Sequence, residues 1–190
     1  MPIDLQRISI KILSEAKADI SLTSFLDIFG RWRAYKAHAA EWVDLADYAH
    51  VPRGPGIMLV GLKVNFAFDL ADPAPGTLYV TRKGLTGTHE QRIKAALRGA
   101  FDLSKRLAAE KNYPAARLCT DALELRFPDR LFTPNTKATD AELRPAIDAA
   151  LNAALGACQL TAVSDAGASY GYNIKAAKAE PLDALLARLA

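Results

Sequence analysis

Apolar residues fall on every second position between Met58 and Leu70. A period of two over this length predicts a β-strand with one apolar face. Residues 71–76 contain two prolines and a glycine, and Leu78 and Val80 then resume the alternation. We therefore expect a long β-hairpin, which the chain enters through a corner at residues 51–56. The alternating series comprises Met58, Val60, Leu62, Val64, Phe66, Phe68 and Leu70.

The periodicity of apolar residues also predicts strands and helices in the rest of the chain. Alternation predicts strands at residues 5–13, 41–48, 118–127, 158–164 and 168–176. Apolar positions three and four apart predict amphipathic helices at residues 22–38, 88–111 and 139–155, with a short helix from Pro181. Thr88–Gln91 and Thr139–Glu142 have the spacing of capping boxes, which satisfy free backbone N–H groups at a helix start.

The predicted order of elements is β-α-β-β-β-α followed by β-α-β-β-α. We expect a single α+β domain over residues 1–190, built from a mainly antiparallel sheet with helices packed on one face. The similar order of the two halves suggests a pseudo-duplicated β-α-β-β-α arrangement, although the halves share no residue pattern.

Composition narrows the class of protein. The chain has 190 residues, of which 51% are hydrophobic, and no apolar run approaches the ~20 residues that a membrane helix needs. The first residues show no secretion signal, so we expect a cytoplasmic protein without a membrane span. Cys119 and Cys158 are interpreted as buried reduced thiols, with a disulfide or redox pair as the alternative.

Positive charge is concentrated in one segment. The net charge is +3, but residues 82–117 hold nine Lys or Arg against three Asp or Glu. Lys94, Arg98 and Lys105 are expected on one side of the second long helix, where they would contact nucleic-acid phosphates or water. No nucleic-acid motif or interleaved aromatic residue accompanies them, which argues against nucleic-acid binding.

One candidate site surrounds the proline corner. Asp47 or His50 is a candidate general base beside Arg53, which would bind an anion. Alternatively, Asp47 accepts backbone hydrogen bonds at the corner and His50 is an ordinary loop residue. The chain has three histidines, no spacing that indicates a metal site, and no G-x-S-x-G nucleophile motif.

Two further groups are candidate ligand contacts. If Leu70 pairs with Thr77, Asn65 lies opposite Arg82, with Lys63 nearby. These side chains would line a ligand cleft or form the solvated side of the sheet. Arg130 and Asn135 lie in residues 128–136, a proline-containing loop too long for a simple turn, and such loops often carry function.

Several short segments of the chain resemble a group of bacterial proteins that have no known activity. These segments are Val43–Pro52, Gly54–Gly56, Val60–Gly61, Asp129–Leu131 and Pro134–Thr136. The resemblance covers about a third of the chain and implies no catalytic residue. Similar proteins have a His-Glu pair after the position of Gly61, where this chain has Leu62 and Lys63. That difference adds to the argument against an enzyme.

The leading hypothesis is a non-catalytic domain that binds a small molecule or another protein. The alternative is an enzyme with an acid–base site at Asp47, His50 and Arg53, to which Asn65 and Arg130 are candidate additions. The third is nucleic-acid binding through the basic helix at residues 88–111. The sequence indicates no particular cofactor, and it allows identical subunits to pair through exposed sheet edges.

Overall fold

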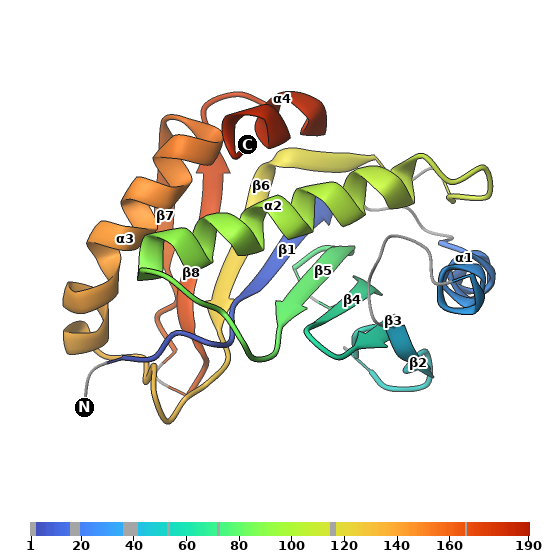
Figure 1. Cartoon of the computed structure of the whole chain (residues 1–190), viewed down its shortest axis with the longest axis horizontal. Coiled ribbons are helices and arrows are strands. Elements are labelled where there is room, and N and C mark those ends of the chain that lie inside the picture. Colours follow the sequence, from blue (N-terminus) through green and yellow to red (C-terminus); the bar gives the residue numbers. More distant parts are fainter. Residues whose placement is uncertain are drawn as a thin grey trace.

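The computed structural model describes residues 3–15, 20–35, 42–52, 54–71, 73–114, 117–165 and 167–190. Within these residues, eight strands form one antiparallel sheet in the order β2-β3-β4-β5-β1-β6-β8-β7 (Figure 1). The strands are β1 (Ser9–Ser14), β2 (Trp42–Asp47), β3 (Ile57–Gly61), β4 (Val64–Asp69), β5 (Gly76–Thr81), β6 (Leu118–Phe127), β7 (Cys158–Ala162) and β8 (Tyr170–Ala176). The helices are α1 (Leu22–Ala34), α2 (His89–Ala108), α3 (Lys137–Leu155) and α4 (Leu182–Arg188).

Both halves of the chain follow the same path. Each begins with a central strand, β1 or β6, and continues through a helix to an edge strand, β2 or β7. The strands that follow lead back to the centre, and a second helix ends each half. The antiparallel pair β1–β6 joins the halves. The first half has one strand more than predicted, whereas the second has the predicted order.

All four helices lie on one face of the sheet, as expected. Phe68 pairs across the sheet with Thr77, so both side chains lie on the same face. The Phe25 ring of α1 stacks on Phe68 at 4.2 Å, and the Thr77 hydroxyl lies 2.7 Å from the Ser104 hydroxyl of α2. Helix α2 also contacts α3 and α4, which complete the layer.

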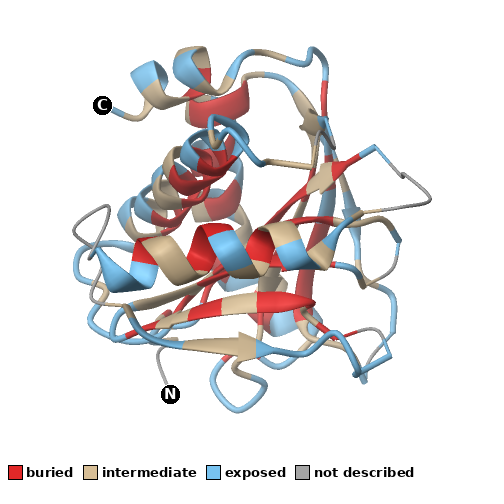
Figure 2. Ribbon diagram, turned by 90° about the vertical axis from the view of Figure 1, so that its right-hand side faces the viewer, coloured by how far each residue is buried: buried red, intermediate tan, exposed pale blue. Residues whose placement is uncertain are grey.

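The hydrophobic core fills the space between the helices and the sheet. Buried positions are concentrated on the strands and on the sheet-facing sides of the helices, whereas the connecting loops are exposed (Figure 2). Ile10 and Ile12 of the central strand β1, with Ile8 just before it, are at most 1% exposed. Removing this apolar surface from water is the main stabilising contribution to the fold.

The prediction of one long strand at residues 57–70 is wrong. These residues form a second hairpin, in which β3 and β4 are joined by Leu62 and Lys63. Val60 pairs with Asn65, so even-numbered residues of β3 share a face with odd-numbered residues of β4. The apolar series therefore changes face at the turn. Met58 and Val60 lie on the helix-free face, whereas Phe66 and Phe68 face α1.

Two local predictions are wrong in position: the register of one strand pair and the start of one helix. Asn65 lies opposite Val80 rather than Arg82, because the β4–β5 register differs from the predicted one by two residues. Helix α3 begins at Lys137, and the Thr136 hydroxyl rather than Thr139 caps it by accepting from the Thr139 N–H. The predicted capping box at Thr88 and Gln91 is confirmed in both of its hydrogen bonds.

A buried ion pair lies on the helix-free face of the sheet. Lys11 Nζ is 2.7 Å from Asp69 Oδ2, and the two side chains are 3% and 8% exposed. Lys11 Nζ also donates to the Ala71 carbonyl at 2.6 Å, and Asp69 Oδ1 accepts from the Ala71 N–H. The pair therefore fixes the chain after β4 against the centre of the sheet.

We predict that Lys11→Met lowers the free energy of unfolding by about 3–5 kcal/mol, because it leaves the Asp69 carboxylate buried without its cation. The double variant Lys11→Met/Asp69→Asn removes both charges and keeps the hydrogen bond from the Ala71 N–H to residue 69, so it should recover most of that loss. Urea denaturation measures both effects. A loss below about 1 kcal/mol in the single variant would show that the site is solvated.

Tyr79 gives the fold a dependence on alkaline pH. Burial raises the pKa of its hydroxyl from 10.0 to about 12. Between these values the unfolded chain loses the proton while the folded chain keeps it, so the free energy of unfolding should fall as the pH rises through this window. Tyr79→Phe should reduce that fall by about 2 kcal/mol, and exposed Tyr48→Phe should leave it unchanged. Denaturation series below pH 10 and near pH 12 test this difference.

Candidate functional site

The loop between β6 and α3 forms the wall shared by two adjoining clefts. The Thr133 side chain is buried and donates a hydrogen bond to the Asp129 carbonyl at 2.6 Å, which fixes the loop. Leu131 and Phe132 project from it and are 81% and 40% exposed. Large apolar side chains exposed side by side on an ordered loop are typical of a recognition surface.

The first cleft is mainly apolar. It has a volume of about 430 Å³ and lies between the loop, the first turns of α3 and the N-terminal segment. The Ile3 N–H donates to Glu142 Oε1 at 3.2 Å, which holds that segment against α3. The lining residues are Ile3, Leu131, Phe132, Pro134, Thr136, Ala138, Thr139 and Glu142.

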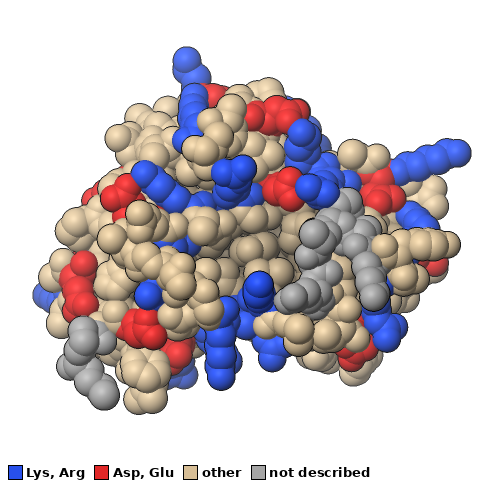
Figure 3. Space-filling view, viewed as in Figure 1, with Lys and Arg blue, Asp and Glu red and all other residues tan. Residues whose placement is uncertain are grey.

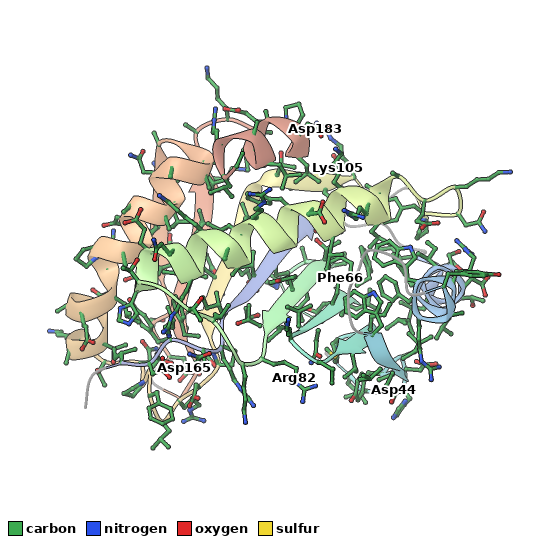
Figure 4. The ribbon with its side chains drawn as sticks, viewed as in Figure 1. Asp44, Phe66, Arg82, Lys105, Asp165 and Asp183 are labelled. Carbon is green, nitrogen blue, oxygen red and sulfur yellow. The ribbon has the colours of Figure 1, made fainter. Side chains whose placement is uncertain are left out.

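The second cleft also has Phe132 in its wall, but polar and charged residues make up most of its lining, and we call it the polar cleft. It has a volume of about 390 Å³ and is lined by Asp4, Gln6, Arg7, Arg82, Lys83, Gly84, Asp129 and Phe132. The segments before β1 and after β5 meet there, since β1 and β5 are antiparallel neighbours. Figure 3 shows Lys and Arg side chains gathered below the middle of α2, in the region where Figure 4 labels Arg82.

Some charged side chains of the second cleft have a partner within the protein, and others have none among the described residues. Asp4 is bound 2.6 Å from Arg92, and that guanidinium lowers the pKa of its carboxyl. Within the described residues, the side chains of Arg7 and Lys83 have neither an ion-pair nor a hydrogen-bond partner, and both residues are exposed. The cleft therefore presents free cations beside an apolar wall, an arrangement that suits an anionic group.

Arg82, which the sequence predicted as a ligand contact, lines this cleft. Its side chain also supports the β3–β4 turn. Its Nη1 donates to the Gly61 carbonyl at 2.9 Å, and its backbone N–H donates to the Lys63 carbonyl. Asn65 Oδ1 accepts from the Gly61 N–H at 3.4 Å. The Lys63 side chain is exposed at the turn. The structure thus brings Lys63, Asn65 and Arg82 together around Gly61.

Arg130 and Asn135 lie in the loop itself. Arg130 is exposed at the tip. Asn135 Nδ2 donates to the carbonyls of Val163 and Asp165, at 3.1 and 2.9 Å. It therefore ties the loop to the connection between β7 and β8, which positions Leu131 and Phe132 without bringing the amide into either cleft.

The candidate acid–base group lies elsewhere, at the end of edge strand β2. Asp47 and His50 are exposed, and Asp47 Oδ1 accepts from the Ala49 N–H at 2.8 Å. Arg53 lies outside the described residues. In the sheet, strands β3, β4, β5 and β1 lie between β2 and β6, and Figure 4 labels Asp44 on β2. The group at β2 and the loop after β6 are therefore separate parts of the surface.

The basic side chains of α2 are paired within the protein. Lys94 Nζ lies 2.6 Å from Glu90, and Arg98 donates to the Leu189 carbonyl. Lys105 pairs with Asp183 of α4, and these two residues are labelled side by side in Figure 4. The carboxylates beside Lys94 and Lys105 weaken the field that a nucleic-acid phosphate would meet.

A buried polar cluster joins α3 to β8. The Tyr170 and Tyr172 hydroxyls both donate to Asp140 Oδ1, and Arg144 lies over the Tyr172 ring at 5.1 Å. Burial is the main cause that raises the pKa of each tyrosine. Both residues are at most 3% exposed, so the cluster fixes α3 on the sheet rather than facing a ligand.

Both cysteines are half-buried free thiols, and burial raises the pKa of each. Among the residues that the structure describes, no group of three or more His, Cys, Asp or Glu side chains is placed to hold a metal ion. None of the described helices is both long and apolar enough to cross a membrane.

No family model and no curated protein matches the chain. The sequence indicated the loop by its length and prolines, but it gave no signal for Arg7, Lys83 or Ile3. These residues reach the clefts only because the sheet places the ends of β1 and β5 beside the loop. The adjacent pair Leu131 and Phe132 was the available clue, since large apolar residues are unusual in a polar loop.

We predict that Asn135→Ala lowers the free energy of unfolding by about 1–3 kcal/mol, because two backbone carbonyls lose their donor. Exposed Asn152→Ala should change it by less than about 0.5 kcal/mol. Urea denaturation gives the comparison. If the two variants are equally stable, Asn135 does not hold the loop.

Proposed function

We propose that the protein is a non-catalytic binding domain whose ligand is a small amphipathic anion. The observation that carries the proposal is the position of Phe132 between an apolar cleft and a cleft with three cationic side chains. The apolar body of the ligand lies against Leu131 and Phe132. Its carboxylate, phosphate or sulfate group lies beside Arg7, Arg82 and Lys83. Burial of the body provides affinity, and the cations provide orientation.

The chemistry of the lining supports binding rather than turnover. Among the described residues, those that line the two clefts include no histidine, cysteine or serine. Asp4 is held ionised by Arg92, because the pKa of its carboxyl is lowered, so it is a poor proton donor near neutral pH. Asp129 Oδ1 lies 3.5 Å from the Phe132 N–H, within the loop's own turn.

The two alternative functions have weaker support. An enzyme centred on Asp47 and His50 would use exposed groups, and the Asp47 carboxylate already accepts a backbone hydrogen bond. Nucleic-acid binding would use Lys94, Arg98 and Lys105, each of which has an internal partner. In the polar cleft, by contrast, Arg7 and Lys83 have no such partner within the part of the chain that the structure describes.

The binding site can be tested with 1-anilinonaphthalene-8-sulfonate, an apolar aromatic anion whose fluorescence rises on binding. We predict saturable binding to the folded protein, weakened roughly tenfold by Phe132→Ala through loss of apolar contact. Arg7→Gln/Lys83→Gln should also weaken binding, and should reduce its dependence on salt.

The matched control is Arg33→Gln/Lys178→Gln, which removes the same charge from exposed positions outside both clefts. It should bind the dye like the unchanged protein. Thermal denaturation must show that each variant is folded, because partly unfolded chains also bind this dye. Equal affinity in Phe132→Ala and the unchanged protein would rule out the proposed site. Native mass spectrometry of the purified protein would then show whether a ligand is retained elsewhere.

A further inference from the structure

The two edges of the sheet differ in how they are protected from other strands. At the β2 edge, the register shifts between Trp42 and Asp44, which marks a bulge or irregularity, and Asp44 and Asp47 are exposed. Bulges and charged side chains are the means by which proteins prevent pairing at an edge. Figure 4 labels Asp44 on this edge, and Asp165 just beyond the opposite edge strand, β7.

The backbone of β2 is also partly occupied. The Tyr48 N–H bonds the Gly56 carbonyl, so even-numbered residues of β2 bond β3 and odd-numbered ones face outward. The outward N–H of Leu45 is bound by Asp44 Oδ1 at 2.8 Å. An added strand would have to displace that carboxylate.

Edge strand β7 has none of these protections. Residues 157–163, Ala-Cys-Gln-Leu-Thr-Ala-Val, include no charged residue and no proline, and the pairing of β7 with β8 shows no shift of register. Gln159, Thr161 and Ala162 are exposed. An uncharged, regular and exposed edge is a template for another strand.

The hydrogen bonds between β7 and β8 show which backbone groups of β7 are free. The Val163 N–H bonds the Gly171 carbonyl, and the Ala177 N–H bonds the Ala157 carbonyl. Odd-numbered residues of β7 therefore bond β8. The N–H and C=O groups of Cys158, Leu160 and Ala162 point outward, and within the described residues no hydrogen bond engages them.

These outward groups match a second copy of the same strand. An antiparallel pair with its two-fold axis at Leu160 would exchange hydrogen bonds between the two Leu160 residues, and between Cys158 and Ala162 of the second copy. Residues 158, 160 and 162 lie on the helix-covered face, because they pair with Ala176, Ile174 and Tyr172. The half-buried Leu160 side chain would then be covered by its own equivalent.

The helix-free face is equally compatible with this pairing. In the same register, Gln159 lies opposite Thr161 of the second copy, and the amide and hydroxyl can hydrogen-bond. The helix layer beside β7 carries Arg144 and Asp148, which already pair at 2.8 Å, so like charges do not confront each other there. We infer that β7 is the surface through which two copies of this chain form a two-fold dimer with one continuous sheet.

The inference is tested by exchanging charges within β7. Gln159→Lys/Thr161→Lys puts lysines opposite each other twice across the two-fold axis, and should raise the dimer dissociation constant roughly tenfold or more. Gln159→Glu/Thr161→Lys puts opposite charges there instead and should restore the dimer. Sedimentation equilibrium over a concentration series measures all three proteins. The matched control is Ala46→Lys on β2, which should dimerise like the unchanged chain.

Thermal denaturation separates lost pairing from lost folding, and the opposite-charge variant provides a second check because it alters the same two positions. An unchanged protein that is monomeric throughout the series would overturn the inference. A dimer that is insensitive to both double variants would also overturn it, because the contact would then lie elsewhere. Loss of the dimer in Ala46→Lys alone would assign the contact to β2.

Discussion

The antiparallel pairing of β1 with β6 is the contact on which the rest of the structure depends. It joins two halves that each have an edge strand and two helices. Strand β1 has a neighbour on both sides, and Ile8, Ile10 and Ile12 form the middle of the core. Helix α2 belongs to the first half by sequence but contacts α3 and α4 of the second. The halves therefore share one core and cannot be regarded as independent units.

The fold class was accessible from the sequence because most elements carry a single period and clear end signals. The capping box at Thr88 and the alternation in β6 and β8 depend on neighbouring residues, which a sequence shows directly. The β3–β4 hairpin was missed because its turn preserves the alternation of apolar residues. Apolar residues are needed on both faces there, so periodicity cannot distinguish one long strand from two short ones. Start positions of helices are similarly ambiguous where several threonines can cap, as at Thr136 and Thr139.

The candidate site was only partly accessible for a different reason. Its two clefts combine residues 3–7, 82–84 and 129–142, which are distant in sequence and meet through strand order. Composition identified the loop, whereas the free cations Arg7 and Lys83 follow no local pattern. The sequence identified Arg82 as a ligand contact, but it paired Arg82 with Asn65, which lies opposite Val80 in the structure. An error of two residues in register keeps a side chain on the correct face and still assigns it the wrong neighbour.

The position of β1 in the sheet has a consequence for how the chain folds. Ile10 pairs with Tyr79 and with Leu125, which follow it by 69 and 115 positions. A ribosome adds about 5–20 residues per second, so β1 waits roughly 6–23 seconds for its second neighbour. Throughout that interval three isoleucines and one side of the strand's backbone lack their final partners. Contacts so distant in sequence also slow folding of the complete chain. Strand β1 is therefore made early but completed late, and its apolar side chains stay exposed until the second half of the chain has been synthesised.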